Sequence, residues 1–161
     1  MNQGEDVALR RATFADQIEI AALVIRHQLN PINLNWSRFW VAVDVRNRVI
    51  GCGQIRKHRA ADELASLAVH PDWQGLGISK RLIHALIDGC DQPVWLMCES
   101  HLIAYYENFG FIEVDDVQSM PPYFQTQSRW SRPTLNMMLS LRGRHLAYMR
   151  RTDPECTGPH S

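Results

Sequence analysis

The chain has 161 residues, of which 45% are hydrophobic and 21% are charged, an ordinary balance for a globular domain. Seventeen Lys and Arg residues match 17 Asp and Glu residues, so the formal net charge of zero disfavours a general nucleic-acid or membrane-surface binder. No apolar run approaches the length of a membrane span, and the first residues lack a signal-peptide pattern. We expect a cytoplasmic protein with a flexible segment at 1–6, one domain at 7–150 and a disordered tail at 151–161.

The cysteines indicate reduced thiols and no metal site. The chain has Cys52, Cys90, Cys98 and Cys156, and no pair of them shows C-x-x-C spacing. Cys52 and Cys98 lie in apolar, strand-like surroundings, which predicts small buried side chains.

Strand-like and helical patterns alternate along the chain. In order, we predict a strand at 7–11, a helix opened by Thr13, a loop at 30–35, strands at 39–45 and 49–56 joined by a turn at 46–48, a strand at 63–69, a helix at 76–88, a strand at 94–98, a helix at 101–109, a strand at 111–117, an irregular connection at 118–133 and a strand at 134–141. Strands interleaved with helices, plus one hairpin, predict an α/β protein with a mixed sheet.

Finer expectations follow from the spacing of particular residues. The buried face of the first helix is predicted to carry Ile18, Ala21, Ala22 and Ile25, and that of the 76–88 helix to carry Ile78, Leu82, Ala85 and Leu86. Glycines inside the 49–56 strand, Gly51 and Gly53, indicate a bulge or a close approach of another element.

The segment from Leu67 to Lys80 is the most informative part of the sequence. An apolar strand end, Leu67-Ala68-Val69-His70-Pro71, leads into a Gln74-Gly75-Leu76-Gly77 turn and then a helix. Such a turn presents backbone N–H groups at a helix N-terminus, where an anion binds. The spacing does not supply a P-loop, and Lys80 stands where a dinucleotide fingerprint needs its third glycine. A plain tight turn is the alternative.

Two motifs together resemble the Gcn5-related N-acetyltransferase (GNAT) superfamily. Gln74-Gly75-Leu76-Gly77-Ile78-Ser79 is similar to its [RQ]-x-x-G-x-[GA] motif, with Ser79 in place of the usual Gly or Ala. Downstream, Tyr105-Tyr106-Glu107-Asn108-Phe109-Gly110-Phe111 resembles its Tyr-Glu-x-x-Gly-Phe segment. The resemblance covers roughly residues 7–140 and implies the acyl-CoA N-acyltransferase fold, in which the fourth and fifth strands are parallel and splay apart.

The resemblance implies acetyl-CoA as co-substrate. The pyrophosphate would accept hydrogen bonds from the backbone of the glycine turn, and pantetheine would pair with the edge of the 63–69 strand as an added strand. Lys80 and Arg81 either reach a phosphate or are solvated, and Asn108 either bonds the cofactor or caps a helix. The implied cofactor-binding residues are Leu67, Ala68, Val69, Gln74, Gly75, Leu76, Gly77, Ile78, Ser79, Lys80 and Asn108.

The implied reaction is direct acetyl transfer to a primary amine of a small molecule or peptide. Tyr106 matches the tyrosine that the family places near the coenzyme A sulfur, which implies a general acid. The base is left open between Glu63, where some relatives carry a glutamate, and Glu99, where many carry asparagine. His70 and His101 are further candidates for the base, because histidine can change its charge near neutral pH, but such a residue is more often a surface or satisfied histidine.

The acceptor site is expected from the first-helix region, the Asn30–Ser37 loop and the 118–133 connection. Trp36, Trp40, Tyr123 and Trp130 would line an aromatic pocket there or serve as core and cover. Relatives are often dimers, so a homodimer is one expected assembly.

Two other functions remain open. A non-catalytic acyl-CoA sensor would keep the glycine turn and lack the chemistry. A nucleic-acid module would use the basic run Arg56-Lys57-His58-Arg59, which the zero net charge disfavours.

Overall fold

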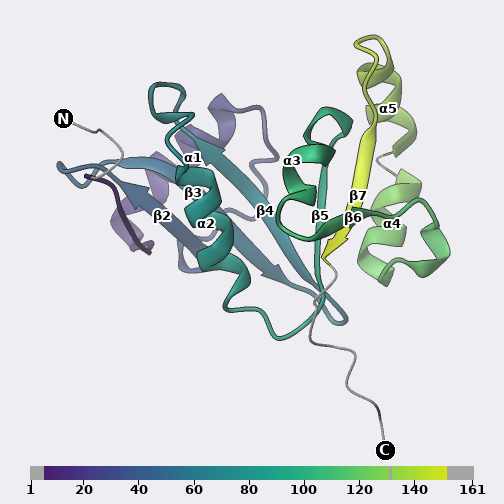
Figure 1. Cartoon of the computed structure of the whole chain (residues 1–161), viewed down its shortest axis with the longest axis horizontal. Coiled ribbons are helices and arrows are strands. Elements are labelled where there is room, and N and C mark those ends of the chain that lie inside the picture. Colours follow the sequence, from purple (N-terminus) through teal and green to yellow (C-terminus); the bar gives the residue numbers. More distant parts are fainter. Residues whose placement is uncertain (1–5, 131, 152–161) are drawn as a thin grey trace, which may run out of the picture. The chain divides into compact units, whose positions relative to one another are not determined.

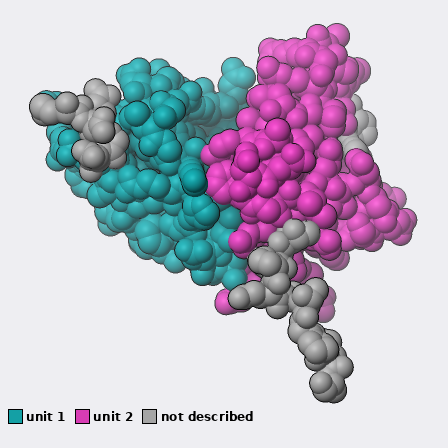
Figure 2. Space-filling view, in the orientation of Figure 1, with its two compact units in different colours: residues 1–56, 64–90 teal, residues 57–63, 91–161 magenta. Residues whose placement is uncertain are grey.

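The structure, a computed structural model, describes residues 6–130 and 132–151. The chain forms two compact units, residues 1–56 with 64–90 (unit 1) and residues 57–63 with 91–161 (unit 2), shown in teal and magenta in Figure 2. The prediction of one domain over 7–150 stays a prediction, and the tail predicted at 151–161 lies, apart from Arg151, outside the described residues.

Seven strands form a mixed sheet in the order β1-β2-β3-β4-β5-β7-β6, which confirms the predicted fold class. The strands are β1 (Ala8–Arg11), β2 (Phe39–Val43), β3 (Val49–Lys57), β4 (Asp62–Val69), β5 (Val94–Glu99), β6 (Phe111–Glu113) and β7 (Leu146–Arg151). β1 with β2, β2 with β3, β5 with β7 and β6 with β7 pair antiparallel, whereas β4 and β5 pair parallel. The parallel pairing is confined to Asp62↔Val94 and Glu63↔Trp95.

The helices carry the labels of Figure 1. The α-helices are α1 (Gln17–Arg26), α2 (Ile78–Ile87), α3 (Ile103–Glu107), α4 (Pro122–Trp130) and α5 (Arg132–Ser140). Short 3-10 turns are η1 (Phe14–Asp16), η2 (Trp36–Arg38), η3 (Pro71–Trp73), η4 (Ser100–Leu102) and η5 (Val117–Ser119). None of these described helices has the length and apolarity needed to cross a bilayer.

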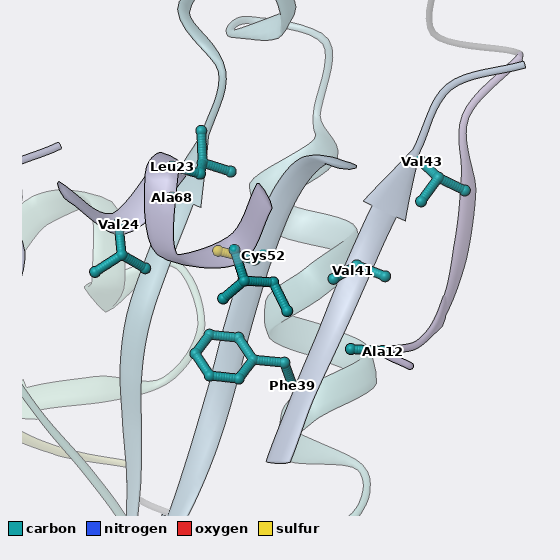
Figure 3. Close-up of a cluster of buried hydrophobic side chains, with 9 residues drawn as sticks. Ala12, Leu23, Val24, Phe39, Val41, Val43, Cys52 and Ala68 are labelled. Carbon is teal, nitrogen blue, oxygen red and sulfur yellow. The ribbon is translucent and has the colours of Figure 1, made fainter. Parts of the chain in front are cut away.

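In unit 1, α1 and α2 cover opposite faces of the strands, with α1 behind and α2 in front in Figure 1. Figure 3 shows Leu23 and Val24 of α1 packed against Phe39 and Val41 of β2 and Cys52 of β3. On the other face, Ile78 and Leu82 of α2 pack with side chains of β2, β3 and β4. Burial of these apolar side chains, at about 25 cal/mol per Å², stabilises the unit.

The predicted buried face of α1 is wrong. Ile18 and Ile25 are 82% and 60% exposed, and the buried residues are Ile20, Leu23 and Val24. Both sets satisfy helical spacing, so periodicity alone could not choose between them. The structure shows where the helix begins and which side of it faces the sheet. Thr13 starts the 3-10 turn η1, in which its N–H and Oγ1 donate to Asp16 Oδ2. The helix α1 begins only at Gln17.

The glycines of β3 allow a close approach of α2, as predicted. A Cβ added at Gly53 would lie 2.7 Å from Leu86 Cδ1, and one at Gly51 would lie 3.2 Å from both Ile78 Cγ2 and Leu82 Cδ1. A side chain at either position would therefore require the facing side chains of α2 to shift. In α2, Ile78, Leu82 and Leu86 are buried as expected.

The C-terminal part of the chain contains the largest errors of the sequence prediction. The connection predicted as irregular at 118–133 contains α4, and the strand predicted at 134–141 is wrong because that segment forms α5. The last strand is β7, and β6 ends at Glu113 rather than at residue 117. Pro122 is the first residue of α4, a position where proline loses no helical hydrogen bond, so it starts a helix here.

Unit 2 has its own core. Figure 1 shows α5 beside β7, with α4 next to α5. Trp95 of β5 stacks on Phe124 of α4, with ring centroids 5.4 Å apart, and Tyr148 of β7 meets Phe124 edge-on at 6.4 Å. Of the aromatic residues of the 118–133 connection, Phe124 thus belongs to this core and Tyr123 packs against it.

Candidate functional site

The glycine turn of unit 1 connects β4 to α2. η3 follows His70, and Gly75 and Gly77 then adopt left-handed φ angles of 79° and 74°. Nothing lies within 4 Å of a Cβ built at either glycine, so the space above the turn is open. The φ angles explain the need for glycine at both positions.

The N-terminus of α2 supplies the hydrogen-bond donors of this turn. Gly77 is the N-cap, and the Arg81 N–H makes a helical bond to the Gly77 carbonyl. The first N–H groups of a helix have no helical carbonyl to bond and carry partial positive charge. Ile78 is buried and anchors the helix start, whereas Leu76 and Lys80 are exposed beside it.

Gln74 of the turn has partners of its own, and so does Arg81, which was expected to reach a phosphate or to be solvated. The Gln74 N–H donates to the Pro71 carbonyl, and the Gln74 side chain donates to the Val69 carbonyl at 3.1 Å. Gln74 therefore fixes the turn to the end of β4. The Arg81 guanidinium donates to the Val7 carbonyl at 2.8 Å, which holds this side chain against the N-terminal strand.

The last part of β4 carries the predicted pantetheine edge, Leu67, Ala68 and Val69. Ala68 and Val69 are buried, and Leu67 is half-buried. Just before them Ser66 has a φ of 54°, a left-handed conformation that is rare for a residue with a Cβ inside a strand. This left-handed residue, the kink of β4, lies directly ahead of the edge.

A buried network secures the kink. With the amide oxygen of the fully buried Gln54 facing its donors, that oxygen accepts from Ser66 Oγ at 2.9 Å and from Arg56 Nε and Nη2 at 3.2 and 3.1 Å. Arg56 Nη2 also donates to the Ile32 carbonyl. One glutamine thus links the strained residue to the loop after α1.

The loop after α1, predicted to help form the acceptor site, is held by its own hydrogen bonds. Gln17 Nε2 donates to the Leu34 carbonyl, and the Trp36 N–H donates to Gln17 Oε1. Trp36 packs against the unit 1 core, and Trp40 lies under the Arg11 guanidinium at 5.1 Å. Trp36 and Trp40 therefore act at least as core cover. Trp130, in α4 of unit 2, is 81% exposed.

Unit 1 also contains a cavity of about 450 Å³. It lies among α1, the start of β3 and η3, and its wall includes Arg26, Arg48, His70 and Trp73. His70 Nδ1 accepts from the Asp72 N–H, which makes this histidine a cap of η3.

Tyr106, the predicted acid, lies on α3 in unit 2. Its ring is half-buried and meets Tyr105 and Phe111 edge-on at 5.3 and 6.0 Å. Burial, with smaller contributions from Cys98 and Tyr105, raises the pKa of the Tyr106 phenol well above its ordinary value. The phenol thus stays protonated at neutral pH, as a general acid must.

Cys98 is buried on β5, as predicted. Burial, followed by the charges of Glu113 and Glu99, raises the pKa of its thiol to about 12. Cys52 is buried in unit 1, and burial raises the pKa of its thiol to about 12 as well. Neither thiol provides a thiolate at neutral pH.

Glu63, one predicted base, is buried rather than exposed. Glu63 is 2% exposed, and its Oε2 lies 2.8 Å from His58 Nε2. The neighbouring Asp62 is fully buried and bonds Lys57 Nζ at 2.7 Å. Sequence reasoning missed His58, which it counted only within a basic run. The available signal was a histidine five residues before a glutamate, across a turn between two strands.

Glu99, the other predicted base, ends β5 in an ion-pair cluster. Its Oε2 accepts from Arg144 Nη1 at 2.9 Å and lies 3.3 Å from His101 Nδ1. One carboxylate oxygen thus already faces two basic side chains. Asn108 uses its amide to cap α3, since Nδ2 donates to the Ala104 and Tyr105 carbonyls.

The described residues contain no cluster of three or more His, Cys, Asp or Glu side chains that could hold a metal ion. The groups described above are the backbone donors of the glycine turn in unit 1 and, in unit 2, the protonated phenol of Tyr106 and the buried carboxylates of Asp62 and Glu63.

The strand order, the parallel β4–β5 pair and the glycine turn define the acyl-CoA N-acyltransferase class of fold. The N-acetylglutamate synthase of Neisseria gonorrhoeae, solved with coenzyme A and N-acetyl-glutamate, is similar with a TM-score of 0.68 and 20% identity, over 91% of this chain and 35% of that chain. Rv2747 from Mycobacterium tuberculosis, solved in complex with CoA, is similar with a TM-score of 0.68 and 22% identity, over 91% of this chain and 99% of that chain.

The sequence comparisons give the family. Residues 35–113 match the family model described as Acetyltransferase (GNAT) domain, which assigns this part of the chain to the GNAT acetyltransferase family. An uncharacterized N-acetyltransferase, ycf52, of Pyropia yezoensis is 37% identical over 54 residues, 31% of each chain. The matched part thus spans about a third of the length of the curated relatives.

Proposed function

We propose that this protein transfers the acetyl group of acetyl-CoA to a primary amine of a small molecule or peptide. The observation that carries the proposal is the turn at the start of α2. Gly75 and Gly77 are left-handed, the space above them is open, and the helix N-terminus supplies donors and positive potential for a pyrophosphate. The two solved relatives described above bind coenzyme A.

In the proposed complex the pyrophosphate binds the N–H groups that follow Gln74, and pantetheine pairs with the Leu67–Val69 edge of β4. A backbone N–H of that edge would stabilise the oxyanion of the tetrahedral intermediate. Tyr106 would then protonate the departing thiolate of coenzyme A. The raised pKa of the phenol and its place on α3 support this role.

We propose direct transfer, without an acetylated enzyme. The amine nitrogen attacks the thioester carbonyl, the C–N bond forms, the C–S bond breaks, and one proton passes from nitrogen to sulfur through protein groups. Glu63 and Glu99 are the carboxylates proposed to assist proton removal. The unbridged thiols of Cys52 and Cys98 support the proposal of a reducing, cytoplasmic setting.

The first experiment measures thermal stability with acetyl-CoA, propionyl-CoA and ATP. A ligand at about a hundred times its dissociation constant stabilises the folded state by roughly 2.7 kcal/mol. We expect a clear rise in melting temperature with both coenzyme A compounds and a smaller rise or none with ATP. If the melting temperature changes with neither coenzyme A compound, the glycine turn is only a structural feature and the proposed cofactor site is wrong.

A screen of amines for release of free thiol from acetyl-CoA then tests the reaction itself. Thiol release that depends on an amine supports the transferase. Stabilisation by coenzyme A without release for any amine would indicate the sensor function instead.

A further inference from the structure

The residue that Glu63 contacts gives it a partner with chemistry of its own. His58 lies between β3 and β4, and its Nε2 is 2.8 Å from Glu63 Oε2. The imidazole stacks on Tyr123 of α4, with ring centroids 3.8 Å apart and an angle of 19°, and meets Phe124 edge-on at 6.2 Å. A carboxylate and two aromatic rings therefore fix the position of one imidazole.

The two members of this pair differ in their access to solvent. The Glu63 side chain is 3% exposed and the His58 side chain 20% exposed. Nε2 faces Glu63, and Nδ1 has no hydrogen-bond partner within the part of the chain that the structure describes. A general base must reach the proton that it removes. Of the two groups, His58 has the more exposed side chain and a ring nitrogen without a hydrogen-bond partner among the described residues.

We propose that His58 is the general base of the reaction, and that Glu63 and Tyr123 are positioning residues for its imidazole. The inference rests on the proposed function. In this arrangement Glu63 accepts the Nε2–H hydrogen bond, which leaves Nδ1 unprotonated and ready to accept. The carboxylate stabilises the imidazolium that forms, as in other carboxylate–histidine pairs. The tyrosine face adds a favourable contact with the cation.

Each proton that is released in the proposed reaction has an acceptor. As the amine nitrogen bonds to the thioester carbon, it loses one proton to His58 Nδ1. The C–S bond breaks as the oxyanion collapses, and the thiolate takes a proton from the Tyr106 phenol. The imidazolium then returns its proton, through solvent, to the Tyr106 phenolate. The products are the N-acetylated amine and free coenzyme A.

The neighbouring charged groups form two separate pairs, Lys57 with Asp62 and His58 with Glu63. The groups that face the imidazole are Glu63 from β4 and Tyr123 and Phe124 from α4. Lys57, the adjacent cation, bonds Asp62 at 2.7 Å with its ammonium group. Among the described residues, the hydrogen-bond partner of the Glu63 carboxylate is His58.

The test compares the pH dependence of kcat/KM for the wild type, His58→Gln and Glu63→Gln. Rates are measured as thiol release from acetyl-CoA with the best amine of the screen. For His58→Gln we expect a loss of about 10²- to 10⁴-fold in kcat/KM, a flattened acidic limb and an unchanged KM for acetyl-CoA. For Glu63→Gln we expect a reduced rate and an acidic limb that remains, since His58 is still present but its imidazole has lost its positioning carboxylate.

The matched control is His145→Gln. His145 also faces a carboxylate, Glu113, but at 3.4 Å and with 54% of its side chain exposed, and it should keep the wild-type profile. The melting temperature and its rise with coenzyme A establish that each variant is folded.

An activity-independent measurement completes the test. Imidazole ¹⁵N NMR of the wild type should show neutral His58 protonated at Nε2, and the opposite tautomer would overturn the proposal. So would an acidic limb that survives in His58→Gln and disappears in Glu63→Gln, which would make Glu63 the base and leave the acetyltransferase function standing. A wild type that releases no thiol with any amine would overturn the proposed function together with the inference.

Discussion

At the scale of single residues, Tyr106 and its environment give the clearest expectation about catalysis. The raised pKa of the half-buried Tyr106 phenol keeps the proton on its oxygen throughout the neutral pH range, so this group remains available as an acid. The coenzyme A thiolate that departs when the tetrahedral intermediate collapses would accept that proton. The same burial makes Tyr106 unsuited to act as the base.

Tyr106→Phe should therefore lower kcat about 10²- to 10⁴-fold and leave the affinity for coenzyme A nearly unchanged, because the ring and its packing remain. Steady-state kinetics and calorimetric titration with coenzyme A measure the two quantities. Tyr105→Phe, the same change one residue earlier on α3, is the matched control and should keep its kcat. Full activity in Tyr106→Phe would remove the phenol from the mechanism.

At the scale of elements, the turn between β4 and α2 depends on backbone conformation more than on side chains. Gly75 lies in the left-handed region, and Gly143, in the turn before β7, has a φ of 66° with equally open space around a built Cβ. The two positions therefore present similar backbone strain to an added side chain, but only one belongs to the proposed pyrophosphate site.

Gly75→Ala and Gly143→Ala should each cost about 1 kcal/mol of folding free energy, since alanine enters the left-handed region at that cost. Only Gly75→Ala should also raise the KM for acetyl-CoA, because its methyl group occupies the open space above the turn. Urea denaturation and initial-rate kinetics separate the two effects. Equal KM values in both variants would argue against pyrophosphate binding at this turn.

Elements also show how far sequence reasoning reaches. The strand at 63–69, the glycine turn and the helix after it were predictable, because glycine, proline and apolar spacing act locally there. The buried face of α1 was not, since Ile18 and Ile20 fit equivalent helical stripes and only packing against β2 and β3 selects Ile20. α5 was mistaken for a strand, because its Met and Leu residues suit either structure until a partner is present.

The candidate site divides in the same way. Gly75, Gly77 and Tyr106 carry local motifs and could be found by reading the chain. His58 could not, because its role depends on Tyr123, which is 65 positions further on and reaches it only through the fold of unit 2. The left-handed Ser66 also gave no signal, since serine is not a residue that predicts such a φ angle.

At the scale of the whole molecule, direct transfer requires both substrates to be bound at the same time. A covalent carrier would need a reactive nucleophile, and burial raises the pKa values of the Cys52 and Cys98 thiols to about 12. Among the described cysteines, Cys90 is half-buried, and its Sγ donates to the Leu86 carbonyl in α2.

Incubation with acetyl-CoA in the absence of an amine should therefore leave the intact mass unchanged, and initial rates should give intersecting rather than parallel double-reciprocal lines. Mass spectrometry after rapid acid quenching is the direct measurement. A mass increase of one acetyl group, mapped to any cysteine, would contradict direct transfer and point to a two-step reaction.

The interleaving of the two units has a consequence for synthesis on the ribosome. Every segment of unit 1 is made by residue 90, whereas residues 57–63 belong to unit 2 and meet Val94, Trp95 and Tyr123 only later. Because chains emerge from their N-terminal end, we expect unit 1 to form first. Asp62 and Glu63 would then remain hydrated in the nascent chain until β5 and α4 emerge. Their two carboxylates would therefore be buried later than the side chains of unit 1.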